Sequence, residues 1–531
     1  MTASGSAGSA VRWIFVGSGF SRTFLMVVVL LVPVFATAQT GRLKAAPTIP
    51  AGFLGTWAGG GIGANNTPAG APSIELPYQQ LDKKLGEFLQ PWAFAAHEAL
   101  EWNTDDTGQG CKLDGMFRPG AATGGGGFRF VEAAGNKLHQ VWSVDERGLA
   151  RIYLDSPHPR NVALTWNGDA RGHFEGNDTL VVDIVGFNSK SWLESDRWVH
   201  TEELHVVERY RLFGNGEYLQ LRTFVDDRLA LKAPYTFTRY YRKVADGTEG
   251  GEGVCNQNAP EDDLWSQRRN TLLNQHDAEF AAFVAKYANE SLPNGPIAAP
   301  ASRTPPSAVP LGANAPPAKP MPTVAVAEAD SVRLRALAGV YEPATGSSGA
   351  TASLKPVGSL ADLALLPAAS QAAKGKNLEF DPAKHCMVVG PFRMMARDDA
   401  RFELLATSSR ATLLFENIAL GNKREIYLSR TQHPSEGDPT YLGDSIARFD
   451  GDTLVVDTVG FNDMTWLNDA GAPHSGALHL VERIRPVQGG KFLEYRVTAD
   501  DPGTLAKPFS YTRYFQRTSA ELKEDFCEDR R

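Results

Sequence analysis

The chain has 531 residues, of which 42% are hydrophobic and 21% are charged. These values are close to those of folded soluble proteins, so wholesale disorder and a collagen-like chain are excluded. The net charge of −8 argues against a general nucleic-acid binder, which needs a basic surface, and four cysteines are too few for a disulfide-dense scaffold.

The N-terminal residues 1–38 have the pattern of a secretory signal peptide. Arg12 and Arg22 supply positive charge, residues 24–35 form an apolar core, and residues 36–38 fit the small-residue cleavage site. The apolar run is shorter than the roughly 20 residues of a membrane-spanning helix. We therefore expect a secreted or periplasmic protein with no membrane span in its mature chain. An uncleaved N-terminal anchor in the membrane is the alternative.

Two halves of the chain repeat each other. Residues 178–188 have the sequence DTLVVDIVGFN and residues 452–462 have the sequence DTLVVDTVGFN. From residue 178 to Tyr240 the offset between the copies stays at 274 without a gap. A repeat of roughly 200 residues can bury its own core, so the sequence predicts two tandem domains.

We expect the first domain, copy 1, to span residues 50–260 and the second, copy 2, to span residues 331–531. Residues 261–290 have the apolar spacing of an amphipathic helix. Residues 291–330 are rich in proline and alanine, a composition typical of an extended linker that buries no core.

Each copy contains two cysteines, Cys111 and Cys255 in copy 1 and Cys386 and Cys527 in copy 2. Four cysteines permit three pairings. The duplication favours one disulfide within each copy, which an oxidising compartment would allow. Four free thiols are the alternative.

The pattern within each copy is typical of antiparallel β structure. Residues 445–461 place Asp-Gly between apolar runs, which is a strong hairpin signal, and residues 478–499 form a second hairpin pattern. Regular short strands with turn signals predict a mainly β fold of two tandem antiparallel barrels, with a β-sandwich as the alternative. We expect a few short helices, one over residues 79–99 with a break at Pro91. Further strands are predicted over residues 138–144, 149–154, 235–242, 411–417, 424–428 and 509–516.

Two stretches of copy 2 carry a resemblance to a known family. GDTLVVDTVGFN at residues 451–462 and PHSGALHLVER at residues 473–483 resemble a widespread family of secreted bacterial proteins without an assigned activity. The resemblance covers most of copy 2 and, less closely, most of copy 1. It implies no catalytic residues.

A shorter resemblance concerns the first strand. Gly55-Thr56-Trp57 resembles the Gly-x-Trp opening strand of lipocalins, and the resemblance implies a lipocalin-like barrel. In that family an arginine from a late strand packs across the tryptophan, and Arg239 and Arg513 are the candidates. Copy 2 departs from the pattern because Tyr341 stands where the tryptophan is expected.

The densest cluster of chemically active residues recurs in both copies. A histidine beside an arginine suits general-base catalysis, although side chains alternate along a strand, so His205 and Glu208 are expected on opposite faces. The alternative is a polar ladder on the outer face of the sheet. The candidate catalytic residues are His200, His205, Glu208, Arg209, His474, His479, Glu482 and Arg483.

Asp183 and Asp457 stand inside apolar strands. If buried, each carboxylate must be paired, with Arg222 or Arg239 as candidate partners in copy 1 and Arg496 or Arg513 in copy 2. In the functional interpretation each aspartate lines a ligand cavity. A solvated face is the alternative. Trp192 and Trp466 suit either a ligand pocket or a barrel core.

The histidines allow one further use, as metal ligands. His158, His200 and His205 with Asp183 form one possible set, and their counterparts in copy 2 are His433, His474, His479 and Asp457. Their spacing matches no compact metal motif. We therefore predict neither a metal nor another cofactor.

These observations favour a binding module for a small apolar, aromatic or sugar ligand. The first alternative is a cofactor-independent lyase, isomerase or hydrolase that uses the His/Arg/Glu cluster inside a barrel. The second alternative is a structural envelope protein whose repeats only stack. The expected partner is a small molecule and not nucleic acid.

Overall fold

A computed structural model describes residues 49–59, 85–100, 127–142, 149–193, 197–246, 323–344, 354–385, 388–416, 423–434 and 439–523. The predicted signal peptide, the helical segment 261–290 and all four cysteines lie outside the described residues, as does most of the linker.

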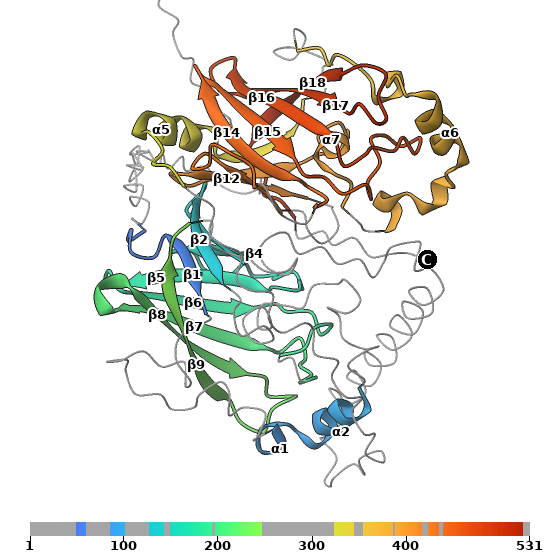
Figure 1. The fold of residues 1–531 in the computed structure, drawn as a ribbon. Coiled ribbons are helices and arrows are strands. Elements are labelled where there is room, and N and C mark those ends of the chain that lie inside the picture. The colour runs from blue at the N-terminus through green and yellow to red at the C-terminus, as the bar shows by residue number, and fades with distance from the viewer. Residues whose placement is uncertain are drawn as a thin grey trace, which may run out of the picture. The chain divides into compact units, whose positions relative to one another are not determined.

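Copy 1 folds into a closed barrel of nine strands (Figure 1). Each strand pairs with the next in the chain, and β1 pairs with both β2 and β9, which closes the sheet. Its strands are β1 (Gly55–Ala58), β2 (Phe128–Ala133), β3 (Lys137–Trp142), β4 (Leu149–Leu154), β5 (Asp169–Glu175), β6 (Thr179–Val185), β7 (His205–Phe213), β8 (Tyr218–Asp226) and β9 (Tyr235–Val244).

Copy 2 repeats this topology as a second closed barrel, which rules out the sandwich. Its first strand pairs with both the second and the last. Its strands are β10 (Gly339–Pro343), β11 (Phe402–Ala406), β12 (Arg410–Phe415), β13 (Lys423–Tyr427), β14 (Asp444–Asp450), β15 (Thr453–Val459), β16 (His479–Val487), β17 (Phe492–Asp500) and β18 (Phe509–Thr518).

Turn chemistry and strand alternation explain the confirmed hairpins. Gly451 has φ of +59° in the β14–β15 turn, a conformation that glycine adopts without strain. The inward positions are apolar in β6 and, apart from Thr458, in β15, and the outward positions include Asp183 and Asp457. A period of two therefore buries one face of each strand.

One pairing in each barrel differs from the predicted antiparallel arrangement. Strand β4 runs parallel to β5, and β13 runs parallel to β14. The connection over residues 155–168 brings the chain back beside β4, with Ile152 opposite Ala170, so that β5 runs in the same direction. This connection carries His158, and the matching connection in copy 2 carries His433.

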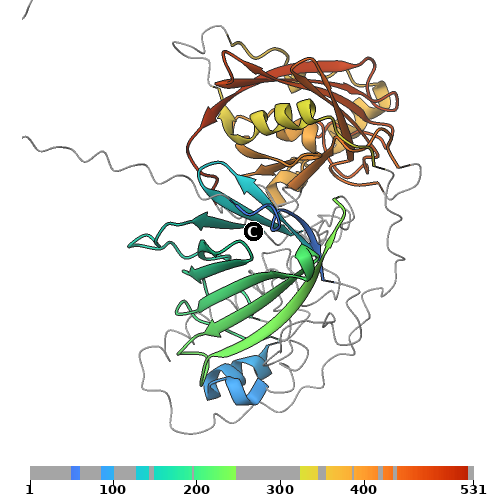
Figure 2. The same ribbon diagram turned by 90° about the vertical axis from the view of Figure 1, so that its left-hand side faces the viewer.

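Each copy also contains short helices. In Figures 1 and 2, α1 (Leu85–Phe88) and α2 (Pro91–Ala99) lie at one end of the first barrel. Pro91 begins α2, which confirms the predicted break, because proline is tolerated at the first helical position. In copy 2, α5 (Glu328–Leu337) begins within the last residues of the predicted linker, and α6 (Pro367–Gly375) and α7 (Pro391–Met394) follow.

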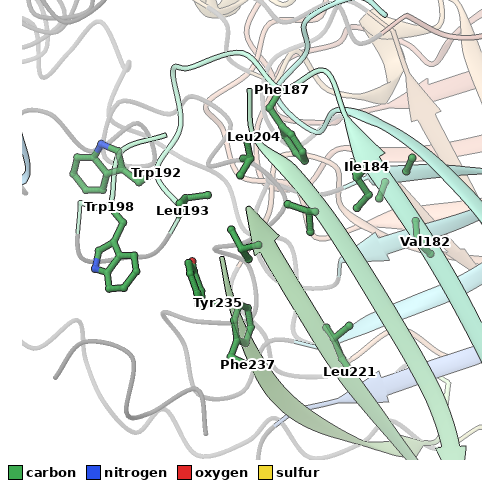
Figure 3. Close-up of a cluster of buried hydrophobic side chains, with 14 of the residues drawn as sticks. Val182, Ile184, Phe187, Trp192, Leu193, Trp198, Leu204, Leu221, Tyr235 and Phe237 are labelled. Carbon is green, nitrogen blue, oxygen red and sulfur yellow. The ribbon is translucent and has the colours of Figure 1, made fainter. Parts of the chain in front are cut away.

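Each barrel encloses its own apolar core. Figure 3 shows part of the first core, where Trp192, Trp198 and Leu204 gather with Tyr235 and Phe237. Trp192 and its counterpart Trp466 are both 5% exposed. Trp192 packs in the apolar core of the first barrel, Trp466 is buried, and the use of either as a ligand-binding residue stays a prediction.

The two barrels contact each other through strands that are buried on both faces. All six residues of β3 and all six of β12 are buried, and a separate apolar cluster joins Val131 and Val141 to Leu405 and Leu414. Each barrel therefore covers outward apolar residues of the other.

Candidate functional sites

The predicted His/Glu/Arg cluster divides between two faces of β7 and β16. Glu208 and Glu482 point into the barrels, at 5% and 0% exposure. His205 and Arg209 point outward, where Arg209 binds Glu175 at 3.1 and 2.5 Å. The histidine and the arginine thus lie on the outer face, and the glutamates belong to a separate, interior group.

His200 and His474 lie in a buried loop, away from both groups. Ser191 Oγ lies 3.0 Å from His200 Nε2, and the His200 Nδ1 lies 3.0 Å from the Thr201 carbonyl oxygen. Thr465 and Ser475 make the same contacts with His474. Burial lowers the pKa of both histidines, so each is a neutral ring that links two loop segments.

Asp227 fastens the same loop to the end of β8. It is fully buried and accepts hydrogen bonds from the Thr201 amide at 2.6 Å, the Thr201 hydroxyl and two amides of the following turn. Its neighbour Asp226 is partly exposed. The two acids therefore point apart, as the alternation of an extended chain predicts.

A chain of alternating acids and histidines lies on the outer face of each barrel. In copy 1, His158 places Nδ1 3.4 Å from Asp169 and Nε2 3.1 Å from Asp183. Asp183 also bonds His205 Nε2 at 3.2 Å. Asp183 therefore lies on the solvated face, with histidines as its partners in place of the predicted arginine.

Copy 2 builds the same chain at the matching positions. His433 lies 2.7 Å from Asp444 and 3.0 Å from Asp457, and His479 lies 3.2 Å from Asp457. Both ring nitrogens of His433 thus face carboxylates. An ionised carboxylate can accept hydrogen bonds but cannot donate them. The arrangement holds the ring in a fixed orientation.

An arginine completes each chain, but from a different position in the sequence. Arg171 on β5 bonds Asp169 at 2.7 Å and lies 4.3 Å from the centre of the Tyr153 ring. In copy 2, Arg430 after β13 bonds Asp444 at 3.1 Å and lies 3.7 Å from the matching tyrosine ring. The two barrels therefore use arginines from different sequence positions to bond the equivalent aspartate and to contact the equivalent tyrosine ring.

Hydrogen bonding shifts the pKa values of residues in this outer chain of acids and histidines. The bond to Asp183 raises the pKa of His205 above its usual value, and the bonds from His205 and His158 lower the pKa of Asp183 although partial burial opposes them. His200 is not part of this group, so the metal-ligand set considered from the sequence does not assemble. Among the described residues, no group of three or more potential ligands is arranged to hold a metal ion.

The interior of the second barrel contains a satisfied ion pair. Arg424 is 1% exposed and donates to Glu482 Oε1 at 2.8 Å, with a second, shorter bond to the other carboxylate oxygen. It also donates to Ser445 and Thr458 at 3.1 and 2.9 Å. Tyr495 completes the group with a 2.7 Å bond to Glu482. A buried charge needs such partners.

The interior of the first barrel keeps the glutamate but lacks this arginine. The matching register positions are Gln140↔Ala150 in copy 1 and Leu413↔Arg424 in copy 2. Glu208 instead accepts a 2.8 Å bond from Tyr210, whose oxygen accepts a 3.0 Å bond from Gln140. Burial raises the pKa of Glu208 to about 7, although Tyr210 and the charge of Arg239 oppose the rise.

Several polar atoms in the interior of the first barrel have no hydrogen-bond partner among the described residues. They are buried and belong to inward-facing side chains of β3 and β8, namely Gln140 Oε1, Trp142 Nε1 and Thr223 Oγ1. Such atoms are costly to bury, and a water molecule or a ligand usually satisfies them. Thr223 lies directly opposite Glu208 in the strand register.

The cation over the first-strand aromatic ring comes from a different residue than predicted. Lys243 Nζ lies 5.2 Å from the Trp57 ring centre, and the Arg517 guanidinium lies 5.2 Å from that of Tyr341. Both residues stand four positions beyond the predicted arginines. Arg239 and Arg513 lie over Phe237 and Tyr511, each at 4.9 Å.

The residues that distinguish the two interiors, above all Arg424, Tyr210 and Gln140, are not among those predicted from the sequence. A signal was present, because these inward positions differ between copies that are otherwise closely matched. It could be used only with the strand register, which says which residues face each other across the barrel.

Comparison with known protein families, with curated proteins and with solved structures finds no match to this chain. The two resemblances therefore stay expectations. Among the described residues, no helix is both long and apolar enough to cross a membrane.

Proposed function

We propose that this protein binds a small molecule and that the ligand lies in the interior of the first barrel, against Glu208. The observation that carries the proposal is the contrast between matched interiors. The second barrel satisfies its buried glutamate with Arg424, whereas buried polar atoms around Glu208 have no partner among the described residues.

The surroundings of Glu208 suit an organic ligand with hydrogen-bonding groups. The ring of Phe128 lies 4.8 Å from that of Tyr241, 5.0 Å from that of Trp142 and 6.1 Å from that of Tyr210. Aromatic walls with a few polar groups are typical of small-molecule sites. They favour an aromatic or polar ligand over a purely apolar one.

The enzymatic alternative cannot use the predicted cluster inside a barrel, but one candidate general base remains on the outer face. His205 and Glu208 face opposite sides of β7, so they cannot act together inside a barrel. The Asp183–His205 pair on the outer face has the contact of a carboxylate-oriented general base. The structural-envelope alternative requires both interiors to be closed cores without a ligand.

Native mass spectrometry of the protein purified from its own host tests the proposal. We expect wild-type protein and the surface variant Glu132→Gln to retain a small molecule and Glu208→Gln to lose it. A ligand retained equally by Glu208→Gln would contradict the proposed site. Protein that carries no ligand, and shows no saturation-transfer signal with phenol, indole or glucose, would contradict the proposed function.

We also propose that the mature chain works outside the cytoplasm and contains the Cys111–Cys255 and Cys386–Cys527 disulfides. The predicted leader and the repeated cysteine pair support this proposal. Intact mass should show loss of residues 1–38, and non-reducing peptide mapping should find these two bonds. A link between Cys111 and either cysteine of copy 2 would contradict the pairing.

A further inference from the structure

We infer that the ligand of the first barrel is a small organic cation of the guanidinium class, which occupies the place that the Arg424 side chain fills in the second barrel. The inference rests on the proposed function and names its ligand class. It follows from comparing the interior of the first barrel with that of the second, which serves as a template because the matching positions there hold a guanidinium group.

The template shows how this barrel holds a guanidinium group. The Arg424 guanidinium contacts both oxygens of Glu482 and the hydroxyls of Ser445 and Thr458. The group is therefore bound by one carboxylate and by hydroxyl acceptors. Guanidinium has five N–H donors in a planar fork, which match such a set.

The first barrel keeps the carboxylate and loses the cation, together with the two hydroxyl groups that contact the cation in the second barrel. Glu208 matches Glu482, and Ala150 stands where Arg424 stands. Ala170 likewise replaces Ser445, since Ala170 pairs with Ile184 as Ser445 pairs with Thr458. One alanine thus replaces the arginine itself, and Ala170 and Ile184 replace the two hydroxyl residues that contact its guanidinium group in the second barrel.

New acceptors appear beside Glu208 in the first barrel. Gln140 Oε1 and Thr223 Oγ1 are buried without a partner among the described residues, where the second barrel has Leu413 and Val497 at the matching positions. Oxygen acceptors next to a carboxylate suit a ligand rich in N–H donors, and the surrounding rings can stabilise a cation.

Other titratable groups face the same interior and set the charge balance. Tyr210 donates to Glu208, Tyr241 lies nearby on β9, and Arg239 adds a positive charge. Burial outweighs the charge of Arg239, so Glu208 holds its proton up to about neutral pH. A bound cation displaces this proton, so cation binding should strengthen as the pH rises through 7.

Thermal-shift and calorimetric titrations with methylguanidinium test the inference, with methylurea as the neutral control of similar shape. We expect methylguanidinium to bind wild-type full-length protein at least about tenfold more tightly at pH 8 than at pH 5.5. Glu208→Gln should abolish this binding and Glu132→Gln should keep it. Equal binding of methylurea would show a neutral ligand and overturn the inference while the proposed function stands.

Exchanging the arginine between copies provides a second measurement. Ala150→Arg should fold and should lose methylguanidinium binding, because its own side chain fills the site. Arg424→Ala should gain a second methylguanidinium site that raises its melting temperature. Failure of methylguanidinium to bind the wild type or to stabilise Arg424→Ala would overturn the inference. If native mass spectrometry then still finds a ligand that depends on Glu208, the proposed function survives.

Discussion

Glu208 and Glu482 occupy matching positions and are both buried, yet their neighbours give them different chemistry. Arg424 supplies a full positive charge to Glu482, whereas Tyr210 offers Glu208 a neutral donor. A buried carboxyl without an adjacent cation is easier to keep protonated. The pKa of Glu208 therefore lies near 7, and the folded protein holds a proton that the unfolded chain releases at lower pH.

The first prediction concerns this proton. Because the folded-state pKa of Glu208 is raised, its contribution to stability is present below about pH 4.3, its usual value, and is lost as the pH rises through about 7. Glu208→Gln should gain up to about 3 kcal/mol relative to wild type between pH 4.5 and pH 8. Urea unfolding at both pH values measures the difference. Glu132→Gln should follow the wild type, and a parallel course for Glu208→Gln would contradict the assignment.

The second prediction concerns the outer chain. The pKa of His205 is raised mainly by its bond to Asp183 and to a smaller extent by the charge of Asp226. Asp183→Asn should therefore lower the His205 pKa, and Asp226→Asn should lower it less. Two-dimensional NMR titration of the His205 ring measures both shifts. The reverse order of the two variants would show that Asp183 is not the main partner of this ring.

At the scale of elements, the hairpins could be predicted from the sequence and two other features could not. Asp-Gly turns and alternating apolar residues identify hairpins such as β14–β15, because the partners are neighbours in the chain. The parallel pairing of β4 with β5 depends on the path of a long connection, and no local signal encodes that path. Strand β2 follows a glycine run and was not predicted.

The residues of the candidate sites likewise divide into those whose placement could be predicted from the sequence and those whose placement could not. Period-two alternation correctly separated Glu208 from His205 on β7. The contact of Tyr210 with Gln140 joins two strands that are far apart in the sequence, and the contact of Asp183 with His158 joins a strand to a long connection. Those contacts could be predicted only after the strands were placed side by side.

The third prediction concerns how a loop is fastened to β17. Asp501 is fully buried and accepts bonds from the Ser475 amide and hydroxyl at 2.7 and 2.6 Å and from the Gly503 amide. Although burial opposes the change, these bonds lower its pKa, so its stabilising effect should disappear as the pH falls below about 4. Asp501→Asn should cost about 2 kcal/mol of stability at pH 7, as charged hydrogen bonds do.

The neighbouring acid is the matched control for this experiment. Asp500 is exposed on the outer face of the same strand, so Asp500→Asn should change the free energy of unfolding by less than about 0.5 kcal/mol. Chemical denaturation of both variants measures the difference. Equal effects of the two substitutions would contradict the role assigned to Asp501.

At the scale of the whole molecule, the contact between barrels combines apolar and ionic groups. Arg129 is 2% exposed and donates to Glu425 and Thr412 of the second barrel at 2.9 Å. His139 lies 3.0 Å from Glu403, and both are buried. Burial lowers the His139 pKa. Removing one partner from such a buried group is expected to be costly, because the other is left without a bond.

The last prediction is that the two barrels stay associated when the chain between them is cut. A protease site inserted after residue 300, in the predicted linker, should yield two fragments that co-elute on size-exclusion chromatography. The contact buries Leu405 and Leu414, and each leucine is worth about 1.5–3 kcal/mol when fully buried. The double variant Leu405→Asp/Leu414→Arg should therefore separate the fragments, whereas Leu378→Asp, at a side chain that is 45% exposed, should not. Fragments that separate without any substitution would show that the linker, and not the buried contact, holds the barrels together.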